Sequence, residues 1–288
     1  MAEIEQMNIH WFPGHMTKTR RYIEKNISQV DIVAETVDAR CIRSSQNPDF
    51  DKLLGNKKRL MIITKCDLAD PAVTSAWVSR FKNQGRGCVT VCLNSGKGVK
   101  DVLPEVRRAL SEQIEKYAAK GMKKTIRMMI CGIPNSGKST LINSLCGKKM
   151  VVAEDRPGVT RGGQWVTLSS DVQLLDTPGI LWNKFEDKNT GMALAFTGAI
   201  KDDVVDIETL ALHLVNTLAA NYPDNLKSRY NIEFDQDNEP LEIFEMICKR
   251  RGFIIRSGEF DYERGAKVIL DEFRGGKLGR ISLEAPNA

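Results

Sequence analysis

The sequence lacks the features of a membrane or secreted protein. It contains no run of 18 apolar residues, and its first 21 residues carry Glu3 and Glu5 where a signal peptide would have an apolar core. Its seven cysteines are scattered and odd in number, unlike a secreted disulfide framework. We therefore expect a cytoplasmic protein with no membrane partner.

A zinc site, long internal repeats and low-complexity tracts are also missing. Cys88 and Cys92 are spaced like a metal-binding pair, but they lie in a strand-like run and no second Cys/His pair accompanies them. With 288 residues, 42% of them apolar and 27% charged, the chain is long enough to bury a core as one large or two moderate domains.

Short apolar runs rich in β-branched residues alternate with helix-like segments through the first two thirds of the chain. This pattern predicts βα units around a mostly parallel sheet. The predicted strands are 31–37, 59–64, 88–93, 125–131, 164–168 and 172–175, and the predicted helices are 72–81, 99–117, 140–146, 207–218 and 241–250. Because the strand signal fades near Val205, we predict an α/β domain over residues 1–204 and a small all-helical domain over residues 205–288.

Charge is unevenly distributed between these two parts. The first 204 residues hold 31 Lys/Arg against 22 Asp/Glu, and the remainder holds 11 against 15. A basic stretch such as residues 116–127 is often only a solvated face, but an asymmetry of this size permits contact with a phosphate backbone.

Residues Gly132 to Ser139 match the phosphate-binding loop G-x-x-x-x-G-K-[ST], between a predicted strand and a predicted helix. In such a loop the backbone N–H groups and the helix start face the phosphates, the lysine supplies charge, and the last hydroxyl can ligate Mg²⁺. The nucleotide-binding residues predicted here are Asn135, Ser136, Gly137, Lys138, Ser139 and Thr140, with Ser139 as the Mg²⁺ ligand.

Two later segments match the switch regions of nucleotide hydrolases. Asp176 ends the strand over 172–175, so its carboxylate is placed to bind the Mg²⁺ shell through water, and the backbone N–H of Gly179 can sense the γ-phosphate. Between the phosphate-binding loop and Asp176, Thr160 can close on Mg²⁺ when the triphosphate is bound.

Residues Thr64-Lys65-Cys66-Asp67 resemble the N-K-x-D motif of GTPases. There the aspartate accepts hydrogen bonds from guanine N1 and N2, which adenine cannot supply, and the lysine stem lies along the base. The first residue is Thr64 instead of asparagine, so the motif does not predict the contact to the base and loop that the asparagine makes in the family. One strand later, Asn94 and Ser95 resemble the last guanine-contacting loop.

The order of the motifs is reversed relative to an ordinary small GTPase, because the base motifs near 64 and 94 precede the phosphate motifs near 132, 160 and 176. The strands keep their spatial places if the usual chain ends are joined, here through residues 118–124. The sequence thus predicts a circularly permuted P-loop GTPase domain whose segment after Gly179 leads directly into the helical domain.

Several motifs in this order resemble the ribosome biogenesis GTPase A family. They are Trp11-Phe-Pro-Gly-His15-Met16, Val37-Asp38-Ala39-Arg40, Gly132 to Thr140, Asp176-Thr-Pro-Gly-Ile-Leu-Trp182 and Thr197-Gly-Ala-Ile-Lys201. The resemblance implies a monomeric GTPase that binds the large (50S) ribosomal subunit and its rRNA in the GTP state. It further implies promotion of late maturation, stimulation by the subunit and release on hydrolysis, with a helical C-terminal domain that contacts RNA.

Two further roles follow from this resemblance. Ile180 stands where many GTPases have the glutamine that orients the attacking water. His15 matches the histidine that takes this role in the family, although a histidine here could also contact RNA or cap a turn. Asn135 matches the asparagine of potassium-dependent GTPases, in which K⁺ stabilises transferred charge, although it could serve only loop geometry.

Two other functions compete with this one. A nucleotide-gated rRNA-binding scaffold with negligible turnover would use the same motifs. A small-subunit permuted GTPase would carry an N-terminal OB-type barrel and a Cys/His zinc segment, and the sequence has neither pattern.

Overall fold

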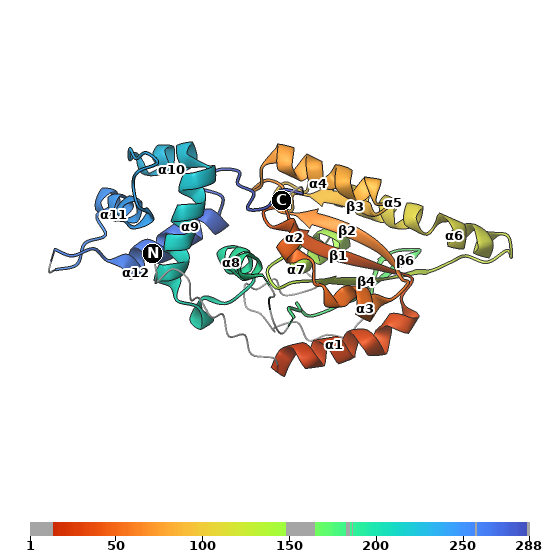
Figure 1. The fold of residues 1–288 in the computed structure, drawn as a ribbon. Helices are drawn as coiled ribbons and strands as arrows, with labels where there is room; N and C mark the ends of the chain where they lie inside the picture. The colour runs from red at the N-terminus through yellow and green to blue at the C-terminus, as the bar shows by residue number, and fades with distance from the viewer. Residues whose placement is uncertain (1–13, 148–164, 183–184, 186, 257, 287–288) are drawn as a thin grey trace. The chain divides into compact units, whose positions relative to one another are not determined.

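The computed structural model describes residues 14–147, 165–182, 185, 187–256 and 258–286, with side chains from Thr17 onward. The chain divides into two compact units, shown with their elements labelled in Figure 1. The sheet unit lies within Phe12–Glu186 and Ser282–Ala288, and the helical unit lies within Asp187–Ile281.

Six strands form the single sheet of the sheet unit. They are β1 (Ile32–Asp38), β2 (Lys58–Thr64), β3 (Gly87–Val91), β4 (Ile126–Gly132), β5 (Trp165–Ser169) and β6 (Val172–Asp176). The order is β3-β2-β1-β4-β6-β5, and every neighbouring pair is parallel except the antiparallel β5 and β6. The predicted strands lie within two residues of these bounds, and the predicted fold class is confirmed.

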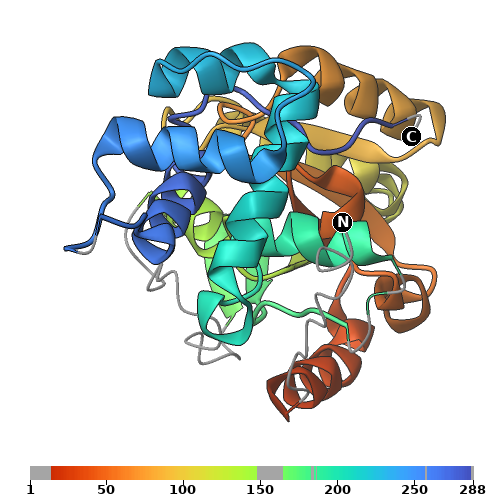
Figure 2. The same ribbon diagram turned by 60° about the vertical axis from the view of Figure 1, so that its left-hand side comes forward.

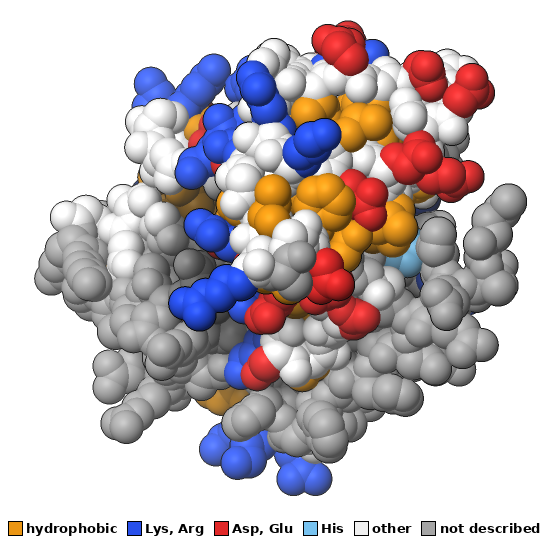
Figure 3. Space-filling view, turned by 90° about the vertical axis from the view of Figure 1, so that its left-hand side faces the viewer, with side chains coloured by type: hydrophobic (Ala, Val, Ile, Leu, Met, Phe, Trp, Pro, Cys, Tyr) orange, Lys and Arg blue, Asp and Glu red, His pale blue; other side chains and the backbone are white. Residues whose placement is uncertain are grey.

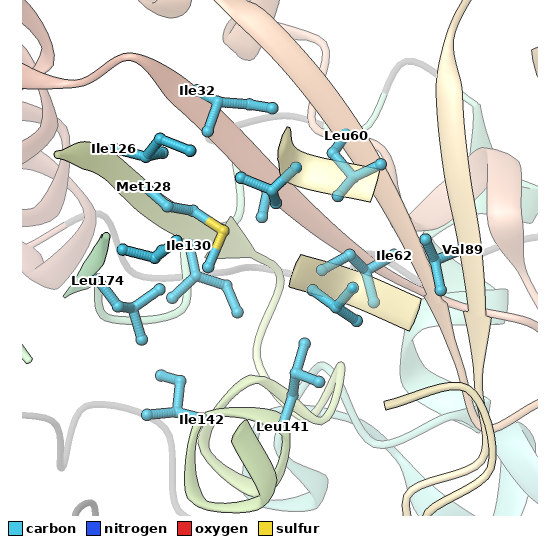
Figure 4. Close-up of a cluster of buried hydrophobic side chains, with 14 of the residues drawn as sticks. Ile32, Leu60, Ile62, Val89, Ile126, Met128, Ile130, Leu141, Ile142 and Leu174 are labelled. Atoms are coloured by element: carbon cyan, nitrogen blue, oxygen red, sulfur yellow. The ribbon is translucent and has the colours of Figure 1, made fainter. Parts of the chain in front are cut away.

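Helices cover both faces of the sheet. Alternate residues of the strands pack against α5 (Val99–Ala109) and α7 (Lys138–Cys146) on one face, and Figure 4 shows Leu141 and Ile142 among these side chains. The opposite face packs against α1 (Gly14–Asn26), α3 (Asp49–Leu54), α2 (Ile42–Ser45) and α4 (Pro71–Asn83). This double cover explains why β1 is buried throughout, including its polar residues Glu35, Thr36 and Asp38.

The segment predicted as one helix over 99–117 is broken in two. Helix α5 ends at Ala109 and α6 (Ser111–Ala118) follows after Leu110. Leu110 leaves helical geometry, with φ −111° and ψ 14°, and its side chain is buried in the core that α5 shares with the sheet. The break could not be predicted from the sequence, because the helix-like spacing of apolar residues continues across Leu110.

The helical unit contains α8 (Lys188–Phe196), α9 (Ile207–Asn221), α10 (Pro223–Tyr230), α11 (Pro240–Arg251) and α12 (Tyr262–Arg274). Helix α9 packs against the four others, as Figure 2 shows. No helix in the described part of the chain is long and apolar enough to cross a membrane.

The unit boundary differs from the one predicted at Val205, because α8 belongs to the helical unit. Helix α8 packs on α9 and α12. The Arg274 guanidinium of α12 donates hydrogen bonds to the carbonyl oxygens of Ala195 (2.9 Å) and Phe196 (3.1 Å) at the C-terminal end of α8. Arg274 also pairs with Asp202 at 2.7 Å, which ties the connection between α8 and α9 to α12.

The segment Ser282–Pro286, here called the tail, returns from the helical unit to the sheet unit. The N–H of Leu283 donates to the Arg40 carbonyl oxygen at 2.7 Å. The Glu284 carboxylate accepts hydrogen bonds from the N–H groups of Arg43 (2.7 Å) and Ser44 (3.1 Å) in the first turn of α2, and the Glu284 carbonyl oxygen accepts one from Trp77 Nε1 (3.2 Å). The tail is therefore part of the sheet unit, although it follows the helical unit in sequence.

Candidate nucleotide site at the carboxyl edge of the sheet

The predicted motifs that the structure describes begin where parallel strands end. Strand β2 ends at Thr64, β4 at Gly132 and β6 at Asp176. The strand registers pair Thr64 with Asp38 of β1 and with Val91 of β3, so these ends lie along one edge. Ligands of open parallel sheets bind outside this edge, where loops with free backbone groups meet. The fold therefore gathers the base and phosphate motifs, although they lie far apart in the sequence.

The two predicted base loops are joined by a hydrogen bond from Asn94 Nδ2 to Asp67 Oδ2 at 3.1 Å. Asn94 is exposed and Asp67 is half-buried, so both remain accessible to a ligand. The Ser95 hydroxyl donates to the Cys92 carbonyl oxygen at 3.3 Å and shapes its own loop. These contacts bring together the side chains that the sequence assigns to the guanine edge.

Thr64, the residue that departs from the N-K-x-D pattern, links the base loop to the phosphate-binding loop. Its Oγ1 lies 2.8 Å from the Ser136 carbonyl oxygen and 3.0 Å from the Val37 carbonyl oxygen, and it is fully buried. The single hydroxyl proton can serve either acceptor. Threonine thus supplies a contact to the phosphate-binding loop that the sequence had left open.

The phosphate-binding loop is held from inside by its own side chains. The Ser136 hydroxyl is buried, 2.7 Å from Thr36 Oγ1 and 2.8 Å from the Ile133 carbonyl oxygen, so a phosphate contact from Ser136 would come from its backbone. Lys138 Nζ donates to the same Ile133 carbonyl oxygen at 3.2 Å. Burial lowers the pKa of Lys138, and the charge of Asp176 opposes that shift. A bound phosphate would replace the Ile133 carbonyl oxygen as the hydrogen-bond partner of Lys138 Nζ and would bring a full negative charge to it.

Asp176 lies at the end of β6 with a side chain that is 7% exposed. Among the described residues neither carboxylate oxygen has a partner within hydrogen-bond geometry. Burial raises the pKa of Asp176 to about 6, against the attraction of Lys138. A buried, unsatisfied carboxylate is costly unless a cation or its water ligands approach it, so Asp176 fits the Mg²⁺ role that the sequence predicts.

Gly179 packs directly against the phosphate-binding loop. A Cβ atom on Gly179 would lie 2.9 Å from the Cα and N atoms of Pro134, too close for any other residue. The next N–H, that of Ile180, donates to the Gly132 carbonyl oxygen at 3.1 Å. The turn after Asp176 is therefore packed against the phosphate-binding loop, and the contact of the Gly179 N–H with the γ-phosphate stays a prediction.

The remaining predicted residues are placed as follows. Asn135 lies in the loop with left-handed backbone geometry, φ 56°, and Gly137 has φ 81° at the start of α7. Ser139 and Thr140 lie in the first turn of α7, where backbone N–H groups are free for an anion. Thr160 lies outside the described residues, and so does the side chain of His15, whose backbone is in the first turn of α1.

Two buried charged residues at this edge were given no role by the sequence. Asp38 at the end of β1 and Arg40 beyond it are 2% and 1% exposed, and they pair at 2.8 Å. Asp38 also pairs with Lys65 of the base loop at 3.0 Å. The sequence signal that could have indicated a role for this pair is the position of Asp38, a charged residue directly after the strand predicted over 31–37.

The permuted strand order, the phosphate-binding loop after β4 and the T-K-x-D turn after β2 define a circularly permuted P-loop GTPase. The comparisons with known proteins agree with this class. The family described as "50S ribosome-binding GTPase" matches residues 127–246. The chain belongs to the ribosome biogenesis GTPase A family, as its relatives show.

One such relative, "Ribosome biogenesis GTPase A" of Priestia megaterium, is 43% identical over 98% of each chain. "Mitochondrial ribosome-associated GTPase 1" of Mus musculus is 32% identical over 95% of this chain and 89% of its own. The solved structure "Crystal structure of GNP-bound YlqF from T. maritima" is 27% identical with a TM-score of 0.66, covering 93% of this chain and 98% of its own. The predicted family resemblance is confirmed.

Proposed function

We propose that the protein hydrolyses GTP while bound to the assembling large ribosomal subunit, promotes late maturation of that subunit and leaves it in the GDP state. The observation that carries the GTPase part is the contact of Thr64 with the Ser136 carbonyl oxygen, together with the Asn94–Asp67 hydrogen bond. These contacts join the T-K-x-D loop to the phosphate-binding loop and to the loop of Asn94, and they support Asp67 as the proposed guanine-reading residue. The family relatives support the ribosomal part of the proposal.

In the proposed reaction, Asp67 and Asn94 select the base, and Lys138 with the N–H groups of the loop binds the phosphates. Bound Mg²⁺, held by Ser139, Thr160 and, through water, by Asp176, would neutralise phosphate charge. His15 orients the attacking water. The backbone of Gly179, packed on Pro134, reports the presence of the γ-phosphate to the segment that follows.

We also propose that Asn135 is a ligand of K⁺. Its side-chain oxygen is a hard donor suited to an alkali cation, and its left-handed backbone places it within the loop that binds the phosphates. Replacing K⁺ by Na⁺ should therefore slow hydrolysis, because the smaller ion fits the same donors poorly. Hydrolysis rates in matched KCl and NaCl buffers measure this, with Asn135→Ala as a variant that should no longer distinguish them. A wild-type rate independent of the cation contradicts the proposal.

Exposed basic side chains support contact with rRNA. Lys249 and Arg250 end α11 and are exposed. Figure 3 shows that Lys and Arg side chains gather on one side of the displayed face, and Asp and Glu on the other. Arg251, the next residue, pairs with Glu272 at 3.1 Å and lies over the Tyr230 ring. Its charge is therefore partly neutralised within the unit.

We predict tight binding to large subunits with a non-hydrolysable GTP analogue and weak binding with GDP. Affinity should fall steeply with salt, because counterions return to the phosphates. Co-sedimentation with purified subunits in each nucleotide state measures this. The variant Lys249→Ala/Arg250→Ala should bind more weakly, whereas Lys267→Ala, which removes an exposed lysine paired with Glu263 on α12, should bind normally.

Equal binding in the two nucleotide states, or preference for small subunits, would contradict the proposal. Single-turnover hydrolysis with and without subunits separates the enzyme from a nucleotide-gated scaffold, which would show negligible turnover in both cases.

A further inference from the structure

The buried carboxylate of Asp38 collects four hydrogen-bond donors beside the base loop. Its Oδ1 accepts hydrogen bonds from the backbone N–H and from Nε of Arg40, both at 3.0 Å. Its Oδ2 accepts from Arg40 Nη2 at 2.8 Å and pairs with Lys65 Nζ at 3.0 Å. Arg40 alone supplies three of these donors, so the fold of this turn would be satisfied without Lys65.

Lys65 has an unusual backbone for its residue type. Its φ is +55°, in the left-handed region that side chains other than Asn, Asp and Gly seldom adopt. Such a conformation persists only where surrounding contacts hold it. Two contacts do so here: the N–H of Leu68 donates to the Lys65 carbonyl oxygen at 2.9 Å, and Asp38 holds the ammonium at the far end of the side chain.

Both ends of the Lys65 side chain are therefore fixed, and its four-carbon stem is held between them. The ammonium is partly covered, with 24% of the side chain exposed. The Arg40 guanidinium holds Asp38 in turn, and the tail holds Arg40 through the bond from Leu283 to the Arg40 carbonyl oxygen. A stem fixed in this way loses little conformational entropy when a flat ring packs against it.

We propose that Asp38, held by Arg40, is a positioning residue for guanine nucleotides. It anchors the Lys65 ammonium so that the stem of Lys65 forms a preformed wall for the purine ring. The proposal rests on the proposed function, because it requires that the ring bind beside Lys65. It adds a contribution to affinity that does not depend on the hydrogen-bonding edge of the base, which Asp67 reads.

The test is a double-mutant cycle of Asp38→Asn and Lys65→Met, measured by equilibrium titration with GDP and with IDP, which lacks the N2 amino group. We expect Asp38→Asn to weaken GDP binding about tenfold, the effect of one charge-assisted hydrogen bond. In the Lys65→Met background the same change should have little effect. The ratio of GDP to IDP affinity should stay at its wild-type value in both, because the wall does not contact N2.

Asp38→Glu keeps the charge and should recover most of the lost affinity. If Asp38→Asn unfolds, which thermal denaturation will show, Lys65→Met alone is the test: it should weaken GDP binding and leave the GDP-to-IDP ratio at its wild-type value. Equal losses with and without Lys65, or a changed GDP-to-IDP ratio, would overturn the proposal, since a general loosening of the turn would disturb Asp67 as well. A wild type that fails to prefer guanine over adenine nucleotides would instead reject the proposed function itself.

Discussion

Asp67→Asn is expected to lower GTP affinity about 100-fold or more and to shift preference towards the xanthine nucleotide. A carboxylate can accept hydrogen bonds from guanine N1 and N2 together, whereas an amide offers one acceptor and turns a donor towards N2. Xanthine carries an oxygen at that position and can accept from the new amide. Asn94 Nδ2 donates to Asp67 Oδ2 at 3.1 Å and so restrains the orientation of this carboxylate.

Competition between GTP and XTP for a fluorescent nucleotide measures this change in selectivity. Asp70→Asn is a matched control three residues along the chain. The Asp70 carboxylate accepts hydrogen bonds from the N–H groups of Ala72 (2.7 Å) and Val73 (3.3 Å) at the start of α4, and asparagine can replace it as a cap. An unchanged GTP affinity in Asp67→Asn would remove Asp67 from the base site.

His15→Ala should lower the rate of GTP hydrolysis while leaving GTP affinity nearly intact, a loss of about 2–4 kcal/mol of transition-state stabilisation. The residue after Gly179 is Ile180, whose side chain is 5% exposed and packs in the core with Ile23 of α1. An aliphatic group buried in this way cannot orient water. A second residue is needed for that step, and His15 in the first turn of α1 is the residue that the family motif offers.

Single-turnover hydrolysis and nucleotide titration on the same preparations separate rate from affinity. His213→Ala on α9 of the helical unit is the control, because His213 belongs to none of the nucleotide motifs. If rate and affinity fall together in His15→Ala, His15 has a structural role instead.

The sheet could be predicted closely from the sequence because its signals are local. Short apolar runs mark β1 to β4, and the G-x-x-x-x-G-K-[ST] motif identifies the loop after β4 without any knowledge of tertiary contacts. The order of the motifs predicted a permuted chain joined through residues 118–124, and the structure then gave the strand order. These predictions each depend on a few neighbouring residues.

The features that the sequence did not predict depend on contacts between distant residues. The sequence predicted no helix over 188–196, and the grouping of α8 with the helical unit depends on Arg274, far along the chain, which donates to the last carbonyl oxygens of α8. The role of Thr64 depends on Ser136 in another loop. The pairing of Asp38 with Lys65 depends on the register of β1 and β2, which no local pattern encodes.

The tail gives the helical unit a second covalent attachment. The chain enters that unit at Asp187 and leaves it at Ile281, and Ser282 to Pro286 are then bonded to the sheet unit. In the described part of the chain, the helical unit is therefore an insertion between two segments of the sheet unit. A truncation that removed the tail would leave the helical unit without its C-terminal attachment to the sheet unit.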